Sequence, residues 1–124
     1  MTVDLEYYFD VYKGTVLPND DSAIKALNKA FRQINIICKN RLSDGTVDSY
    51  DENIQEIVKN IVCEQAEFNT TNADIINAAL KRYTINGVTI EYATNQQIAS
   101  INGIFINQTL YSELTIYGLT YRGF

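Results

Sequence analysis

Two amphipathic segments with helical spacing dominate the sequence and constrain its fold more than any other feature. The first follows Pro18 and the polar run at positions 19–22, where Asp or Ser can cap the first turn of a helix. Its apolar residues keep to one helical stripe, which comprises Ile24, Leu27, Phe31, Ile34, Cys38 and Leu42. This pattern predicts a helix over about residues 22–41 whose stripe faces the core.

The second amphipathic segment follows a turn-forming run at positions 43–46. Ser49 and Glu52 have the S-x-x-E spacing of a capping box, which predicts the start of a helix that extends to about Phe68. Its expected core face comprises Ile54, Ile57, Val58, Ile61, Val62, Gln65 and Phe68, with Gln65 as the polar exception. Two such helices favour a mostly α fold.

The other segments are shorter. Residues 4–13 fit either a strand or one helix face, and Gly14 favours a short helix that stops there. Asn86-Gly87 between two β-prone runs predicts a β-hairpin over about residues 81–92, whereas residues 93–101 are left unassigned. A last helix is expected from Asn107 to Tyr117, with Gly118 as its left-handed terminator.

The predicted architecture is a small helical bundle with a β-hairpin and an extended C-terminal tail. At 124 residues the chain is long enough for one domain with an ordinary hydrophobic core, and 46% of its residues are hydrophobic. We therefore expect one helical domain over residues 1–118 and a tail over residues 119–124. No apolar run is long enough to predict a membrane span, and the first residues lack the pattern of a signal peptide, so synthesis in the cytoplasm is expected.

The composition argues against catalysis and against metal or cofactor binding. The sequence contains no histidine, and its two cysteines, Cys38 and Cys63, form no CxxC motif. Neither a glycine-rich phosphate loop nor a nucleophile elbow is present. The net charge is −5 and the ten basic residues are scattered, so tight binding to DNA is not expected.

Three features indicate contact with other proteins. Nine tyrosines are a high count, and tyrosine is enriched at interfaces, although most of them can instead complete a small core. Ile36 and Cys63 lie behind the main stripes of their helices, which favours a second packing face against a neighbouring subunit. The apolar tail after Gly118 either folds back on its own domain or docks on a partner as an extended strand.

Four short motifs follow one another along the chain. They are Glu6-Tyr7-Tyr8 with Tyr12-Lys13-Gly14, then Leu27-Asn28-Lys29-Ala30 leading to Asn40-Arg41-Leu42, then Val62-Cys63-Glu64-Gln65-Ala66-Glu67 followed by the predicted hairpin, and finally Tyr117-Gly118-Leu119-Thr120-Tyr121-Arg122-Gly123. Together they cover nearly the whole chain and resemble the head–tail adaptor (head-tail connector) family of long-tailed bacteriophages, particularly those of Gram-positive hosts. The terminal Gly-Leu-x-Tyr-Arg-Gly motif is the most specific of the four.

The resemblance implies a virion structural protein at the head–tail junction. Its copies, usually a dodecamer, would form a homo-oligomeric ring below the portal protein, receive the next connector (stopper) protein, and let genome DNA pass without sequence-specific binding. On this interpretation Ile36 and Cys63 lie at the subunit interface, and Asn86 and Gly87 contact the next connector. The tail that docks on the portal comprises Leu119, Thr120, Tyr121, Arg122, Gly123 and Phe124.

Two other functions remain open from the sequence. A small soluble regulator could bind a host or phage protein through a tyrosine-rich surface. A tail-terminator protein would also form rings, but on the tail tube. Gene neighbourhood would separate these alternatives, because a portal gene just upstream favours the adaptor.

Overall fold

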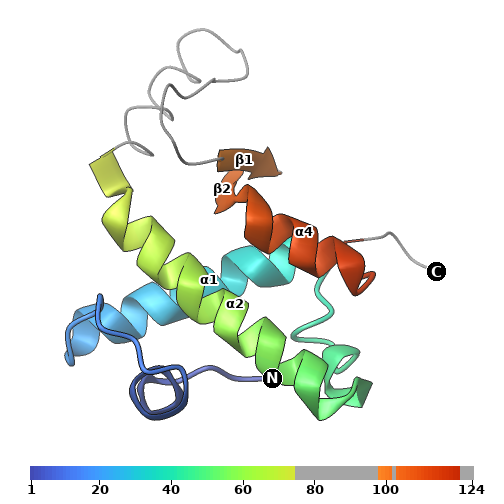
Figure 1. Cartoon of the computed structure of the whole chain (residues 1–124), viewed down its shortest axis with the longest axis horizontal. Helices are drawn as coiled ribbons and strands as arrows, with labels where there is room; N and C mark the ends of the chain where they lie inside the picture. Colours follow the sequence, from blue (N-terminus) through green and yellow to red (C-terminus); the bar gives the residue numbers. More distant parts are fainter. Residues whose placement is uncertain (75–97, 102, 121–124) are drawn as a thin grey trace, which may run out of the picture.

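The computed structural model describes residues 1–74, 98–101 and 103–120, and within these ranges the fold is mostly helical (Figure 1). The predicted hairpin over residues 81–92 lies outside the described residues. In chain order the described elements are η1 (Tyr7–Val11), α1 (Asp21–Ile37), η2 (Val47–Ser49), α2 (Glu52–Thr71), β1 (Ile98–Ile101), β2 (Ile104–Asn107) and α4 (Gln108–Ile116).

Helix α1 begins where the sequence predicts and ends earlier. Asp20 caps it, because its side chain accepts a hydrogen bond of 2.9 Å from the backbone N–H of Ser22. The helix stops at Ile37 instead of continuing to residue 41, since Lys39 and Asn40 adopt left-handed conformations with φ values of 58° and 65°. The side chain of Asn35 stabilises the turn that follows by accepting from the N–H groups of residues 42 and 43.

Helix α2 uses a different cap from the one predicted. Ser49 ends the short helix η2, and the side chain of Asp51 accepts from the N–H of Asn53 at 3.2 Å instead. The prediction of a capping box between Ser49 and Glu52 is therefore wrong, although the predicted helix itself is confirmed. An extended Tyr50 separates the two helices, so the residue next to Glu52 takes the capping position.

The N-terminal segment folds into the short helix that the sequence favours over a strand. After η1, Lys13 has a φ of 62°, and the N–H of Gly14 donates to the carbonyl of Tyr8 at 2.9 Å. The glycine is required because a Cβ at position 14 would lie 2.0 Å from the ring of Tyr8. The backbone thus closes directly over this tyrosine.

Helix α4 matches its prediction at both ends. The side chain of Asn107 accepts from the N–H of Thr109 at 2.9 Å, and Gly118 has a φ of 75° just beyond the helix. Strands β1 and β2, which precede α4, form a two-stranded antiparallel sheet that pairs Ile98 with Asn107 and Ile101 with Ile104. The first of these strands lies in the stretch 93–101, for which the sequence predicts no element.

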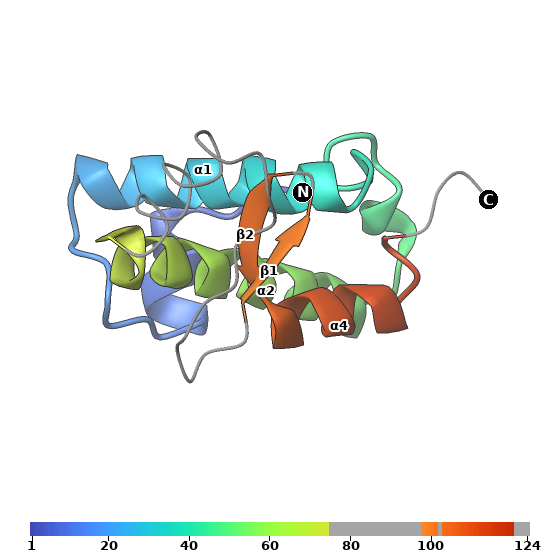
Figure 2. The same cartoon turned by 90° about the horizontal axis from the view of Figure 1, so that it is seen from above.

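Helix α2 is central, because other elements contact it on several sides. Figure 2 shows α1 on one side of α2 and α4 on the other, and the N-terminal segment forms hydrogen bonds with α2 through its tyrosines. The core combines Leu27, Ile34, Val58, Ile61, Val62, Ile106, Leu110, Leu114 and smaller residues from the same elements. The buried side chain of Gln65 joins three elements, since its Nε2 donates to the carbonyl of Phe105 at 2.9 Å and lies 3.1 Å from Oε1 of Gln33.

The core stripe of α1 is rotated from the predicted one. Ile24 is 44% exposed and Phe31 is only partly buried, whereas Ala23 and Ala30 are fully buried. Small residues on this face let α1 approach α2 closely, so the helix turns the alanines inward and Ile24 outward. Leu27, Ile34, Cys38 and Leu42 are buried as predicted.

Candidate functional site

The beginning of the predicted docking tail is part of the core. Leu119 is fully buried, and its N–H donates to the carbonyl of Leu114 at 3.1 Å. The side chain of Arg41 donates from Nη1 to the carbonyl of Gly118 at 3.2 Å and also to that of Leu119. The assignment of Leu119 to a docking tail is therefore wrong, because the hydrophobic residue after the left-handed glycine packs back on its own domain.

The next residue of the predicted tail also contacts the domain. Thr120 is half-buried, and its hydroxyl lies 3.2 Å from that of Thr115. Tyr121, Arg122, Gly123 and Phe124 lie outside the described residues, as do Asn86 and Gly87 of the predicted connector contact. Arg41 is a residue that the sequence analysis missed, because a contact with residues 77 and 78 positions further along leaves no local signal.

The predicted interface at Cys63 is also wrong, because this residue is fully buried. Cys63 does lie on the side of α2 opposite Ile54, in one stripe with Glu56, Asn60 and Glu67. The N-terminal segment of the same chain covers that stripe, since Tyr7 donates to Oδ1 of Asn60 at 2.7 Å. Ile36, in contrast, is 49% exposed on α1 and remains a candidate interface residue.

Two tyrosines of the N-terminal segment form hydrogen bonds with one carboxylate of α2. The hydroxyl of Tyr8 donates to Oε2 of Glu67 at 2.7 Å, and the hydroxyl of Tyr12 donates to Oε1 at 3.0 Å. The oxygen of Tyr8 also accepts from the N–H groups of Val16 and Leu17 at 3.1 and 3.0 Å. Burial, reinforced by the hydrogen bond to Glu67, raises the pKa of Tyr8 and Tyr12, so both remain protonated donors at neutral pH.

This tyrosine cluster has the properties of a structural contact. Tyr8 is fully buried, its ring lies 5.7 Å from that of Tyr12, and the three groups that form hydrogen bonds with its oxygen belong to the chain itself. The alternative in which tyrosines complete a small core therefore holds for these residues. A partner would have to use other surfaces.

Neither cysteine has the environment of a nucleophile. Burial raises the pKa of Cys38 to about 12, and burial together with the carboxylates of Glu67 and Glu64 raises the pKa of Cys63 to about 12. Within the described ranges, no group of three His, Cys, Asp or Glu side chains is arranged to hold a metal ion. No helix in the same ranges is long and apolar enough to cross a membrane.

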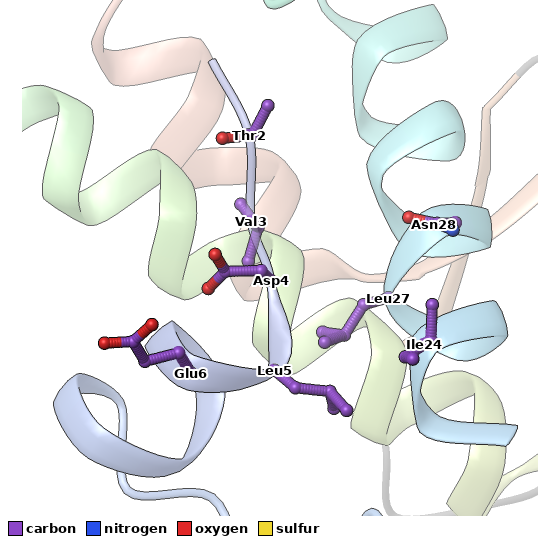
Figure 3. Close-up of a pocket in the computed structure, with 8 residues that line it drawn as sticks. All are labelled: Thr2, Val3, Asp4, Leu5, Glu6, Ile24, Leu27 and Asn28. Carbon is purple, nitrogen blue, oxygen red and sulfur yellow. The ribbon is translucent and has the colours of Figure 1, made fainter. Parts of the chain in front are cut away.

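An open pocket of about 480 Å³ separates the N-terminal segment from α1 (Figure 3). Leu5, Ile24 and Leu27 provide its apolar surface, and in Figure 3 they lie between the two backbone segments. The carboxylates of Asp4 and Glu6 point away from α1 in the same view. These two acids also border a second hollow on the outer side, beside η1.

The exposed aliphatic side chains are spread over three parts of the described surface. Ile24 and Ile36 lie on α1, Val11 and Val16 lie in and after η1, and Ile116 on α4 is 76% exposed. Comparison with protein-family models gives no match, and neither curated proteins nor solved structures give one. Functional interpretation therefore depends on these surfaces and on the motifs of the sequence.

Proposed function

We propose that this chain is the head–tail adaptor of a tailed bacteriophage. Copies of it would form a ring below the portal and serve as a joint between the DNA-filled capsid and the tail. The next connector protein would bind the opposite side of the ring. Genome DNA would pass through the channel without sequence-specific contacts.

The observation that carries the proposal is the terminal motif, in which Gly118, Leu119, Tyr121, Arg122 and Gly123 keep the order seen in the adaptor family that the sequence resembles. Gly118 ends α4 and Leu119 is anchored in the core, so the chain is held in place directly before the segment that we assign to the portal. A short peptide held in this way loses less conformational freedom on binding than a free chain end would.

The tail segment that we assign to the portal is therefore shorter than the sequence predicts and comprises residues 121–124. Tyr121 and Phe124 can fill apolar pockets in a partner, and Arg122 can form a bidentate bond with a portal carboxylate. The mostly helical fold and the net charge of −5 are compatible with a ring around DNA, because an acidic subunit offers few phosphate anchors to a sliding duplex.

Purified virions and the portal protein of the same phage provide the test. Electron microscopy should place the chain in a collar between head and tail, and portal binding should be lost when residues 121–124 are deleted. This deletion spares Leu119, so the melting temperature should change little. Absence from virions, or portal binding that survives the deletion, contradicts the proposal, and a position on the tail tube would favour a tail terminator instead.

Arg122→Ala tests the charged contact separately from the apolar ones. It should weaken portal binding by roughly 10-fold or more, the effect expected for loss of a charge-assisted hydrogen bond. Lys13→Ala, which removes a charge from an exposed residue of the N-terminal segment, is the matched control and should bind the portal normally. Equal binding by both variants would show that Arg122 makes no such contact.

A further inference from the structure

The outward face of α1 carries a basic stripe. Lys25, Lys29, Arg32 and Ile36 follow one another at intervals of four, three and four residues, which places them on one side of the helix. The three cations are exposed, and Ile36 at the end of the stripe is 49% exposed. Leu27 and Ile34 mark the opposite, buried side, so the stripe points away from α2.

None of these three cations forms a hydrogen bond or an ion pair with another residue in the described ranges. A solvated row of charges is ordinary on a helix and would indicate nothing by itself. It gains meaning if the same chain presents an acidic surface with which it forms no ion pair within one molecule.

The N-terminal segment presents such a surface. Asp4, Glu6 and Asp10 are exposed around an open hollow of about 280 Å³, and Val11 beside them is 53% exposed. Among the described residues, the one cation that borders the hollow is Lys59, whose Nζ lies 5.3 Å from the ring centre of Tyr7. Three carboxylates against one ammonium leave this hollow acidic.

The carboxylates of Asp4 and Glu6 point away from α1, the helix that carries the basic stripe (Figure 3). The two surfaces form no ion pair with each other within the described ranges of one chain. They match in composition, since each combines three charges of one sign with a half-exposed aliphatic side chain at its edge. Two copies can therefore bring opposite charges together and cover Ile36 and Val11 in one contact.

We propose that copies of this chain associate head to tail, with the basic stripe of α1 on one copy against the acidic hollow of the next. A contact between two different surfaces repeats from copy to copy and closes into a ring when the rotation allows it. The inference deepens the proposed adaptor function by assigning its subunit contact, and it rests on that function for its biological role. Its test, however, needs no portal.

The contact should be weak and sensitive to salt, because exposed charge pairs are screened within about 10 Å at 0.1 M ionic strength. Sedimentation of the wild-type protein should show association at about 20 mM salt and at least roughly 10-fold weaker association at about 500 mM salt. A wild-type protein that stays monomeric at both salt concentrations, up to millimolar protein, overturns the proposal.

Two variants each remove one surface. Lys25→Gln with Lys29→Gln and Arg32→Gln neutralises the basic stripe, and Asp4→Asn with Glu6→Gln and Asp10→Asn neutralises the acidic hollow. Each variant alone should be monomeric. An equimolar mixture should form dimers that grow no further, because each variant retains one intact surface and only one productive contact is possible. A mixture that stays monomeric, or that assembles beyond dimers, contradicts the head-to-tail arrangement.

Net charge needs a matched control. The basic-stripe variant changes the net charge from −5 to −8, and so does a control with Asn53→Glu, Gln108→Glu and Ser112→Glu at exposed positions elsewhere. The control should associate like the wild type. The acidic-hollow variant has a net charge of −2, so general repulsion cannot explain its loss of association. Equal loss in the control would overturn the proposal.

A cross-linking measurement covers the case in which a variant does not fold. A carbodiimide joins an amine and a carboxylate that are in direct contact, so wild-type dimers should yield cross-links from Lys25 or Lys29 to Glu6 or Asp10 of another copy. Links between other parts of the surface would contradict the proposal. Failure of portal binding, in contrast, would contradict the adaptor function and leave this contact intact.

Discussion

Replacing Leu119 with Ala tests whether the chain after α4 belongs to the fold. Leu119 is fully buried against the core, and a Leu→Ala change at such a site costs about 2–4 kcal/mol of unfolding free energy. The entropy of unfolding is roughly 2.1 cal/mol/K per residue, which for 124 residues gives about 0.26 kcal/mol/K. The melting temperature should therefore fall by about 8–15 °C.

Thermal unfolding followed by circular dichroism measures this shift, and Ile116→Ala is its matched control. Ile116 is the last residue of α4, three residues before Leu119, but it is 76% exposed. Its replacement should therefore lower the free energy of unfolding by less than about 0.5 kcal/mol. A Leu119→Ala protein that melts within about 2 °C of the Ile116→Ala protein would refute the assignment of Leu119 to the core.

Three further predictions concern the N-terminal segment and the cysteines. Gly14→Ala should destabilise the protein by roughly 2 kcal/mol or more in urea unfolding, because a Cβ would lie 2.0 Å from the ring of Tyr8; an unchanged midpoint would contradict this close contact. Cys63 should react with a thiol reagent as slowly as Cys38 in the native protein and quickly only after denaturation; fast native labelling of Cys63 would mean that the N-terminal segment does not cover α2. Burial raises the pKa of both thiols from 9.0 to about 12, so the unfolded chain loses these protons first and stability should fall as pH rises from about 9 to 12. The double variant Cys38→Ala with Cys63→Ala should flatten the dependence of the urea midpoint on pH, and an equally steep dependence would assign it to other groups.

The helices could be predicted because their signals are local. The cap at Asn107 and the left-handed Gly118 each act within one turn, and the structure has both where the sequence predicts them. The two-stranded sheet has a local signal of the same kind, which the sequence prediction did not use. Its strands flank positions 102–103, where the sequence repeats the Asn-Gly pair that had been used to predict a turn at residues 86–87.

The surfaces were harder to predict, because periodicity identifies the faces of a helix but not how many of them are covered. Cys63 was assigned correctly to the face of α2 opposite Ile54 and wrongly to a subunit interface. The residues that cover it are Tyr7, Tyr8 and Tyr12, which are far away in the sequence. The spacing of large apolar residues predicts that Ile24 lies in the core, although the alanines of the same helix pack there instead.

The enclosure of α2 has a consequence for how the protein can evolve. Its inner positions are fixed by contacts on several sides, with α1 on one and the N-terminal tyrosines on another. The outward residues of α1 and of the N-terminal segment contribute little to that packing. Substitutions there can accumulate without loss of folding, so the surfaces that choose partners are free to diverge while the central helix stays the same.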